Sequence, residues 1–129
     1  MTKGSFNAKI SAEFTPPKTW RLVKQLSFKT HLLTRDDIKI LKEIGVNIAD
    51  TGRITCKVGM RTDLASVPRA VWGIISPWDV ARAAVIHDHL YASLRSYYHS
   101  DGMNKDTWRK ARKLSDKVFL WGMQSAQPF

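Results

Sequence analysis

The residues best suited to chemistry lie in the second half of the chain, where a histidine, carboxylates and a tyrosine recur at helical spacing. His87, Asp88 and Tyr91 share one face of a predicted helix with Ala84, whereas His89 points the other way. A carboxylate held against one imidazole nitrogen fixes the tautomer and leaves the other nitrogen free to take a proton from water. The pattern therefore predicts general-base chemistry at His87.

The carboxylate that would orient His87 lies on a second predicted helix, where Asp116 and Phe119 belong to one stripe. Two helices joined by a short loop usually pack antiparallel, which would bring Asp116 to the His87 stripe and put both carboxylates in one groove. His87, Asp116 and Tyr91 are therefore the candidate catalytic residues. A structural interpretation stands beside this one, because a histidine next to an aspartate is often a buried, hydrogen-bonded pair without catalytic duty.

A cation site is the second predicted feature. Asp88 would be free to bind a hard cation such as Ca²⁺, which takes carboxylate and backbone carbonyl oxygens together. Asp63, in the turn Thr62–Arg69, is a second candidate ligand for the metal, since a loop carboxylate beside exposed carbonyls would complete such a site. Ser66 in the same turn lacks the Gly-x-Ser-x-Gly context of a nucleophile, and a turn hydrogen bond is the better interpretation.

The elements that must position these residues differ between the two halves of the chain. Alternation of apolar and polar residues over Trp20–Phe28 and Arg53–Val58 predicts two strands. Between them, Thr34 and Asp37 resemble a capping box that begins a short helix ending at Gly45. The N-terminal half is therefore expected to be mostly β.

The C-terminal half carries helix signals. A long helix is expected over Ser76–Ser96 with Pro77 in its first turn, and a second from Asn104 or Asp106 to about Met123. The predicted fold class is α+β: a small antiparallel β-sheet packed on an antiparallel helical hairpin, in a single domain of residues 1–129.

Composition bounds the partners and the compartment. Of 129 residues, 21 are Lys or Arg and 11 Asp or Glu, and the net charge of +10 favours nucleic acid, anionic lipid or an acidic protein without choosing among them. A basic, solvated surface is the alternative, and no nucleic-acid-binding motif is recognised. The single Cys56 cannot form an internal disulfide, Met1–Ile10 lacks a signal-peptide core, and no apolar run reaches the ~20 residues of a transmembrane span.

Three stretches of the second half resemble a small domain family carried by bacteriophages and prophages. They are Thr62-Asp63-x-Ala65-Ser66-x-Pro68-Arg69, Arg82-Ala83-Ala84-x-x-His87-Asp88-x-x-Tyr91, and Asp116-x-x-Phe119. That family is known as a domain of unknown function. The resemblance implies viral origin and a site formed by Asp63, His87, Asp88, Tyr91 and Asp116.

The patterns His87-Asp88-x-x-Tyr91 and Asp116-x-x-Phe119 are also similar to the helix pair of prokaryotic phospholipases A2. In that family the histidine is the general base, the adjacent aspartate binds Ca²⁺, and the aspartate of the second helix orients the histidine. The resemblance implies the same roles for His87, Asp88 and Asp116. Because the chain has no clear glycine-rich calcium loop ahead of the helix, a metal would need a different set of carbonyl ligands.

These observations lead to two expectations about function. The first is a phage protein, made in the cytoplasm of a bacterial host, with a metal-assisted His/Asp hydrolase site that acts on a host-envelope component such as phospholipid during infection or lysis. The second is a non-catalytic virion component, such as a tail or head accessory protein. In that case the same residues would fix a polar core, and the basic surface would dock on other, acidic virion proteins.

Overall fold

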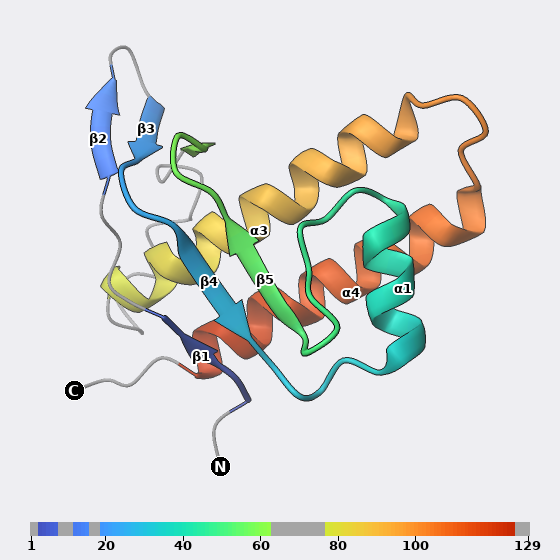
Figure 1. Cartoon of the computed structure of the whole chain (residues 1–129), viewed down its shortest axis with the longest axis horizontal. Coiled ribbons are helices and arrows are strands. Elements are labelled where there is room, and N and C mark those ends of the chain that lie inside the picture. The colour runs from blue at the N-terminus through green and yellow to red at the C-terminus, as the bar shows by residue number, and fades with distance from the viewer. Residues whose placement is uncertain (1–2, 8–11, 16–18, 63–76, 126–129) are drawn as a thin grey trace.

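Two small antiparallel β-sheets form the N-terminal half of the protein, in a computed structural model that describes residues 3–7, 12–15, 19–62 and 77–125. The strands of the first sheet are, in spatial order, β1 (Ser5–Phe6), β4 (Leu26–Lys29) and β5 (Arg53–Cys56). Those of the second are β2 (Ala12–Thr15), β3 (Thr19–Leu22) and β6 (Arg61–Thr62). Figure 1 shows the first sheet lying against the helical half of the chain.

The segment Trp20–Phe28, predicted as one strand, is two strands that belong to different sheets. Strand β3 ends at Leu22 and β4 begins at Leu26, and the exposed side chains of Lys24 and Gln25 lie in the bend between them. Leu22 and Leu26 are both fully buried, so the alternation stays in phase across the bend. A period-two pattern reports which residues face the core, and it does not report where the chain turns.

Strand β5 pairs antiparallel with β4 and packs on the helical layer. Ile54 and Cys56 are buried, as the alternation predicted. The strand ends at Cys56 and not at Val58, whose side chain is 61% exposed where the chain enters the turn at Gly59. The Sγ atom of Cys56 lies 3.9 Å from the backbone oxygen of Val85, so β5 contacts the following helix directly.

The short helix α1 (Arg35–Glu43) confirms the predicted capping box. The hydroxyl of Thr34 accepts a hydrogen bond from the backbone N–H of Asp37 at 3.1 Å, and the Asp37 carboxylate accepts one from the backbone N–H of Thr34 at 3.0 Å. The helix is capped by Ile44, and Gly45 follows with a φ of +95°. Glycine reaches this left-handed conformation without the steric cost of a side chain, which explains why the helix ends there.

The described part of the C-terminal half contains two long helices: α3 (Pro77–Tyr98) and α4 (Lys105–Gln124). Helix α3 runs two residues past the predicted end at Ser96, and Ser76, where the prediction begins, lies outside the described residues. Helix α4 begins as predicted, since the Asn104 side chain accepts hydrogen bonds from two backbone N–H groups of the first turn.

The two long helices pack antiparallel along their length, as Figure 1 shows. Near the connecting loop, the indole N–H of Trp108 donates to the backbone oxygen of Leu94 at 3.2 Å. At the other end, a Cβ atom added to Gly122 would lie 3.1 Å from the Cβ of Ala83. A side chain at residue 122 would therefore push the helices apart, and glycine allows their close approach.

One hydrophobic cluster joins the first sheet to all three described helices. Its fully buried members include Phe28 of β4, Ile54 of β5, Leu41 of α1, Leu90 of α3 and Ala111 of α4. The fold is α+β, with antiparallel sheets in the N-terminal half and helices at the C-terminus. None of the described helices has both the length and the apolar character needed to span a membrane.

Candidate active site

The candidate active site lies where α3 and α4 contact each other, and Figure 1 shows the course of these two helices. His87 of α3 and Asp116 of α4 face each other, with 3.3 Å between His87 Nε2 and Asp116 Oδ1. Their neighbours Ile86 and Ser115 are buried in the helix interface, so the packing of the helices fixes the pair. The His87 side chain is 22% exposed and that of Asp116 is 55% exposed, which leaves the pair within reach of solvent.

Aromatic rings from both helices hold the imidazole of His87. The ring of Tyr91, one turn along α3, lies 4.1 Å from it between centroids. The ring of Phe119 on α4 stacks on it at 4.5 Å with an interplanar angle of 25°. These contacts set the plane of the imidazole, so both aromatic residues pack against the candidate base.

Tyr91 also completes the polar network of the site. Its hydroxyl donates a hydrogen bond of 2.7 Å to Asp116 Oδ1, the same oxygen that faces His87. Burial raises the pKa of the Tyr91 phenol, and the hydrogen bond to Asp116 raises it further, against the opposing effect of the Arg112 guanidinium. The phenol is therefore protonated at neutral pH and acts as a donor that holds the Asp116 carboxylate in place.

The arrangement decides which imidazole nitrogen is available for chemistry. An ionised carboxylate only accepts hydrogen bonds, so a bond between Asp116 and His87 Nε2 requires the proton to sit on Nε2. The lone pair is then on Nδ1, which can take a proton from a water molecule.

Asp88 faces a different set of neighbours, which corrects the predicted single groove. Its carboxylate accepts a hydrogen bond from the hydroxyl of Thr62 at the end of β6. Its charge also contributes, after burial, to raising the pKa of the Cys56 thiol to about 12. Successive residues of a helix differ by about 100° in direction. Asp88 therefore lies against the sheets, while His87 faces α4.

The surroundings of Asp88 are mixed in charge. They form a pocket of about 350 Å³ whose lining includes Thr62, Asp88 and two cationic side chains, Arg61 and Arg95. Within the described residues, no three His, Cys, Asp or Glu side chains come together as metal ligands. Ca²⁺ takes roughly six to eight oxygen ligands, so the described carboxylate and hydroxyl do not complete a calcium site. Asp63 and Ser66 lie outside the described residues.

His89 has a structural contact of its own. Its Nε2 accepts a hydrogen bond of 3.2 Å from the backbone N–H of Asn47, in the segment before β5. Burial lowers the pKa of His89, since the charged imidazolium is disfavoured away from water. This side chain joins α3 to the sheet half of the protein, and its acceptor nitrogen is already used.

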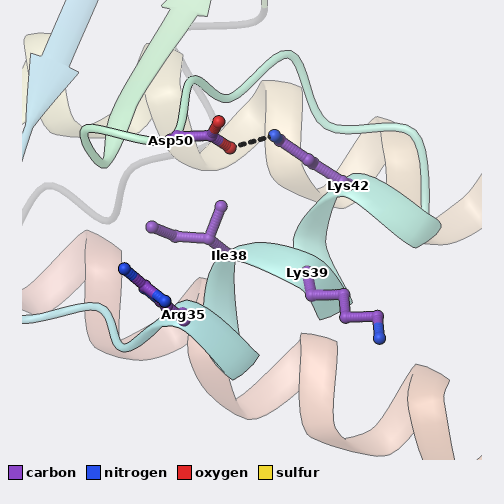
Figure 2. A pocket seen from close by; sticks show the side chains of 5 residues that line it. All are labelled: Arg35, Ile38, Lys39, Lys42 and Asp50. Carbon is purple, nitrogen blue, oxygen red and sulfur yellow. Dashed lines mark hydrogen bonds and ion pairs between the residues drawn. The ribbon is translucent and has the colours of Figure 1, made fainter.

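A larger pocket, of about 470 Å³, lies beside α1 and shares no lining residue with the His87 site. Figure 2 shows Lys42 and Asp50 pointing toward each other across it, with Arg35 and Lys39 on the same helix. The hydrogen bond to Lys42 is the main cause that lowers the pKa of Asp50. The described part of its lining offers charges but no histidine, cysteine or hydroxyl group, so the size of the pocket alone does not indicate chemistry.

The sequence did not point to every contact of the site. The expected cation site placed the turn that begins at Thr62 close to Asp88, but no sequence pattern indicated the hydrogen bond between these two residues, which lie 26 positions apart. The approach of Arg112 to Tyr91 did have a signal, since Arg112 lies four residues before Asp116 on the same helical stripe.

Comparison with known proteins identifies a family for this chain. A family model described as a protein of unknown function (DUF1353) covers residues 38–128, from within α1 to beyond α4, and includes every candidate site residue. No curated protein and no solved structure matches the chain significantly.

Proposed function

Since the chain belongs to the DUF1353 family, whose function is unknown, we propose its activity from the site: a hydrolase with His87 as general base. The observation that carries the proposal is the 3.3 Å approach of His87 Nε2 to Asp116 Oδ1 between neighbouring helices. This contact favours the tautomer in which Nδ1 can accept a proton. A positioned general base typically accelerates a reaction by ~10²–10⁴-fold.

The proposed reaction is hydrolysis of a carboxylic ester. His87 Nδ1 removes a proton from water while the water oxygen bonds to the ester carbonyl carbon. The bond from this carbon to the alcohol oxygen then breaks, and the imidazolium returns the proton to the departing alkoxide. The products are a carboxylic acid and an alcohol, and His87 ends in its starting state.

Asp116, Tyr91 and Phe119 are positioning residues in this proposal. Asp116 would hold the His87 tautomer and stabilise the imidazolium that forms when the proton is taken. The 2.7 Å hydrogen bond from Tyr91 would keep the carboxylate aimed at Nε2, and the stacked ring of Phe119 would keep the imidazole plane fixed.

The proposed substrate is phospholipid of a bacterial envelope, reached by a phage-encoded protein during infection or lysis. Support for this class comes from the similarity of the two helix motifs to prokaryotic phospholipases A2. The meeting of His87 with Asp116 and Phe119 adds support, because the two halves of that pattern come together in space. The net charge of +10 would draw the protein to anionic lipid.

Calcium is a separate part of the proposal. Asp88 and Asp63 would be its carboxylate ligands. The two arginines that line the Asp88 pocket oppose the binding of a divalent cation there by charge repulsion. The proton transfers assigned to His87 do not require Ca²⁺. Melting temperatures measured with Ca²⁺ and with a chelator test this part alone.

The decisive experiment measures hydrolysis of labelled phospholipid vesicles, with Ca²⁺ and with a chelator. The wild type is compared with His87→Ala and with the matched variant His31→Ala, which removes an exposed histidine far from His87 in the sequence. We expect the wild type and His31→Ala to release fatty acid and His87→Ala to lose at least ~10²-fold of the rate. Circular dichroism and thermal melting establish that all three proteins fold.

A wild type that is inactive on phospholipid, and whose melting temperature ignores Ca²⁺, would rule out the phospholipase proposal. One observation favours the second candidate, a virion component, in that case. Asp116 Oδ1 faces both Tyr91 and His87, and such a satisfied polar network also serves to fix two packed helices. Mass spectrometry of purified phage particles would then test whether the protein is a virion component.

A further inference from the structure

A groove next to the His87 site has the lining of a ligand-binding site. It lies between the last turns of α3 and the first turns of α4 and has a volume of about 420 Å³. Pockets that hold small ligands typically measure ~300–1,000 Å³. Tyr91 borders the groove and also bonds Asp116, so the groove continues directly from the candidate active site.

Apolar and aromatic groups form the walls of this groove. Leu94 is buried at its base, and the rings of Tyr98 and Trp108 meet edge to face at 5.5 Å between centroids. The hydrogen bond from the Trp108 indole to the Leu94 backbone oxygen fixes that ring. Tyr98 is nevertheless 46% exposed, although an aromatic ring is usually more buried in a soluble protein. The groove therefore offers fixed apolar surface to a ligand.

The charges at the groove have one sign. Arg112 stands 5.7 Å from the centre of the Trp108 ring and close to the Tyr91 hydroxyl, and Arg95 borders the groove from α3. Among the described residues, no carboxylate lines this groove. Guanidinium groups bind carboxylates and phosphates with paired hydrogen bonds, so this lining would favour an anion over a cation.

We propose that this groove binds an amphiphile that joins an apolar chain to one anionic group. The chain lies along Leu94, Tyr98 and Trp108, and the anionic group meets Arg112 and Arg95. The inference rests on the proposed function in one respect: the fatty acid released by ester hydrolysis at His87 has this chemistry, and the groove begins where it would be released.

The test compares two ligands of equal chain length and opposite charge. Decanoate and decyltrimethylammonium are titrated below their micellar concentrations, and binding is followed by calorimetry and by tryptophan fluorescence. We expect saturable binding of decanoate that is clearly tighter than that of the cation. Equal binding of the two ligands would overturn the proposal.

Variants locate the site. In the double variant Arg95→Gln with Arg112→Gln, we expect decanoate binding to weaken about tenfold or more. Arg109→Gln removes an exposed charge one residue from Trp108, outside the groove lining, and should bind as the wild type does. Trp108→Phe should abolish most of the fluorescence change while calorimetry still detects binding. A double variant that binds decanoate like the wild type would also overturn the proposal.

His87→Ala separates this inference from the proposed activity. This variant should bind decanoate like the wild type, because His87 does not line the groove. A wild type that binds decanoate but does not hydrolyse phospholipid would support the groove proposal and contradict the proposed activity. A wild type that hydrolyses phospholipid but does not bind decanoate would contradict the groove proposal and support the proposed activity.

Discussion

Two histidines stand two residues apart on α3, and their surroundings give them different chemistry. His87 faces Asp116 of the neighbouring helix, stacks on the ring of Phe119, lies against the tilted ring of Tyr91 and is 22% exposed. His89 accepts the backbone N–H of Asn47, and burial lowers its pKa. A carboxylate partner stabilises an imidazolium, whereas an N–H donor and a dry environment oppose it.

The comparison shows that a histidine's partner, more than its position on a helix, decides its chemistry. An imidazole that gains a proton must keep its hydrogen bonds in the charged form. His87 can do so, because its Nε2 then still donates to Asp116. His89 cannot, because its Nε2 would have to give up the Asn47 contact. Variants that separate these two environments test the comparison most directly.

The largest expected effect is the difference in activity between substitutions of the two histidines. His87→Ala should reduce vesicle hydrolysis by at least ~10²-fold, because the proposed base is lost. His89→Gln should retain the wild-type rate, since glutamine can also accept the N–H of Asn47. Initial rates measured at equal concentrations of folded protein give the comparison. Equal losses in both variants would show that α3 responds as a unit and that His87 has no special role.

The next effect concerns the partner of His87. Asp116→Asn should lower the hydrolysis rate by about 10²-fold, because a neutral amide does not stabilise the imidazolium. The melting temperature should change little, since the Asp116 side chain is 55% exposed. A pH profile of the rate is the measurement that distinguishes a positioning role from a purely structural one. An unchanged rate and profile in Asp116→Asn would contradict the pairing.

His89 should appear in the pH dependence of stability. Its folded pKa lies below the ordinary value of 6.5, so its contribution to stability is present above that pH. The contribution is lost as the pH falls through the lowered folded pKa, because the unfolded state then binds the proton more readily. Melting temperatures from pH 7 to pH 5 should therefore fall more steeply for the wild type than for His89→Gln. Parallel curves for the two proteins would contradict this account of His89.

Tyr91 should give a smaller effect at the other end of the pH range. Its folded pKa is raised above 10, so its contribution to stability is present below that value and is lost as the pH rises through the folded pKa. Tyr91→Phe removes this titration together with the hydrogen bond to Asp116. Between pH 9 and pH 11, the melting temperature of the wild type should fall faster than that of the variant, and circular dichroism is sufficient to follow it.

The smallest effect is expected in the pocket beside α1 (Figure 2). Asp50→Asn breaks the ion pair with Lys42. The side chain of Asp50 is 90% exposed and that of Lys42 is 46% exposed. Exposed ion pairs contribute little to stability and are screened by salt. The hydrolysis rate and the melting temperature at physiological salt should match the wild type. A marked loss of hydrolysis in Asp50→Asn would indicate that the active site lies in this larger pocket and not at His87.

Helical spacing was sufficient to predict the pairing of His87 with Asp116. Both lie on predicted helices with clear start signals, and a short loop leaves antiparallel packing as the usual outcome. The same spacing failed for Asp88, because sharing one broad helix face does not tell which neighbour a side chain will meet. That information lies in the sheets, whose strands come from distant parts of the chain.

The strands were harder to predict than the helices. Trp20–Phe28 has the alternation of a single strand, yet it contributes to two sheets. Strand pairing involves residues far apart in sequence, such as Phe28 with Ile54, and no local pattern encodes it. The groove beside Tyr91 was missed for a related reason: its walls come from the ends of two helices, and only the packed hairpin brings Tyr98 to Trp108.

The buried thiol of Cys56 makes it possible to time the opening of the native protein. Cys56, on β5 and in contact with α3, is 1% exposed, and burial raises the pKa of its thiol to about 12. A thiol reagent at neutral pH can therefore react only in molecules in which the sheet has separated from the helix. The rate of labelling, with or without a ligand of the neighbouring helices, would report how often the two halves of the protein come apart.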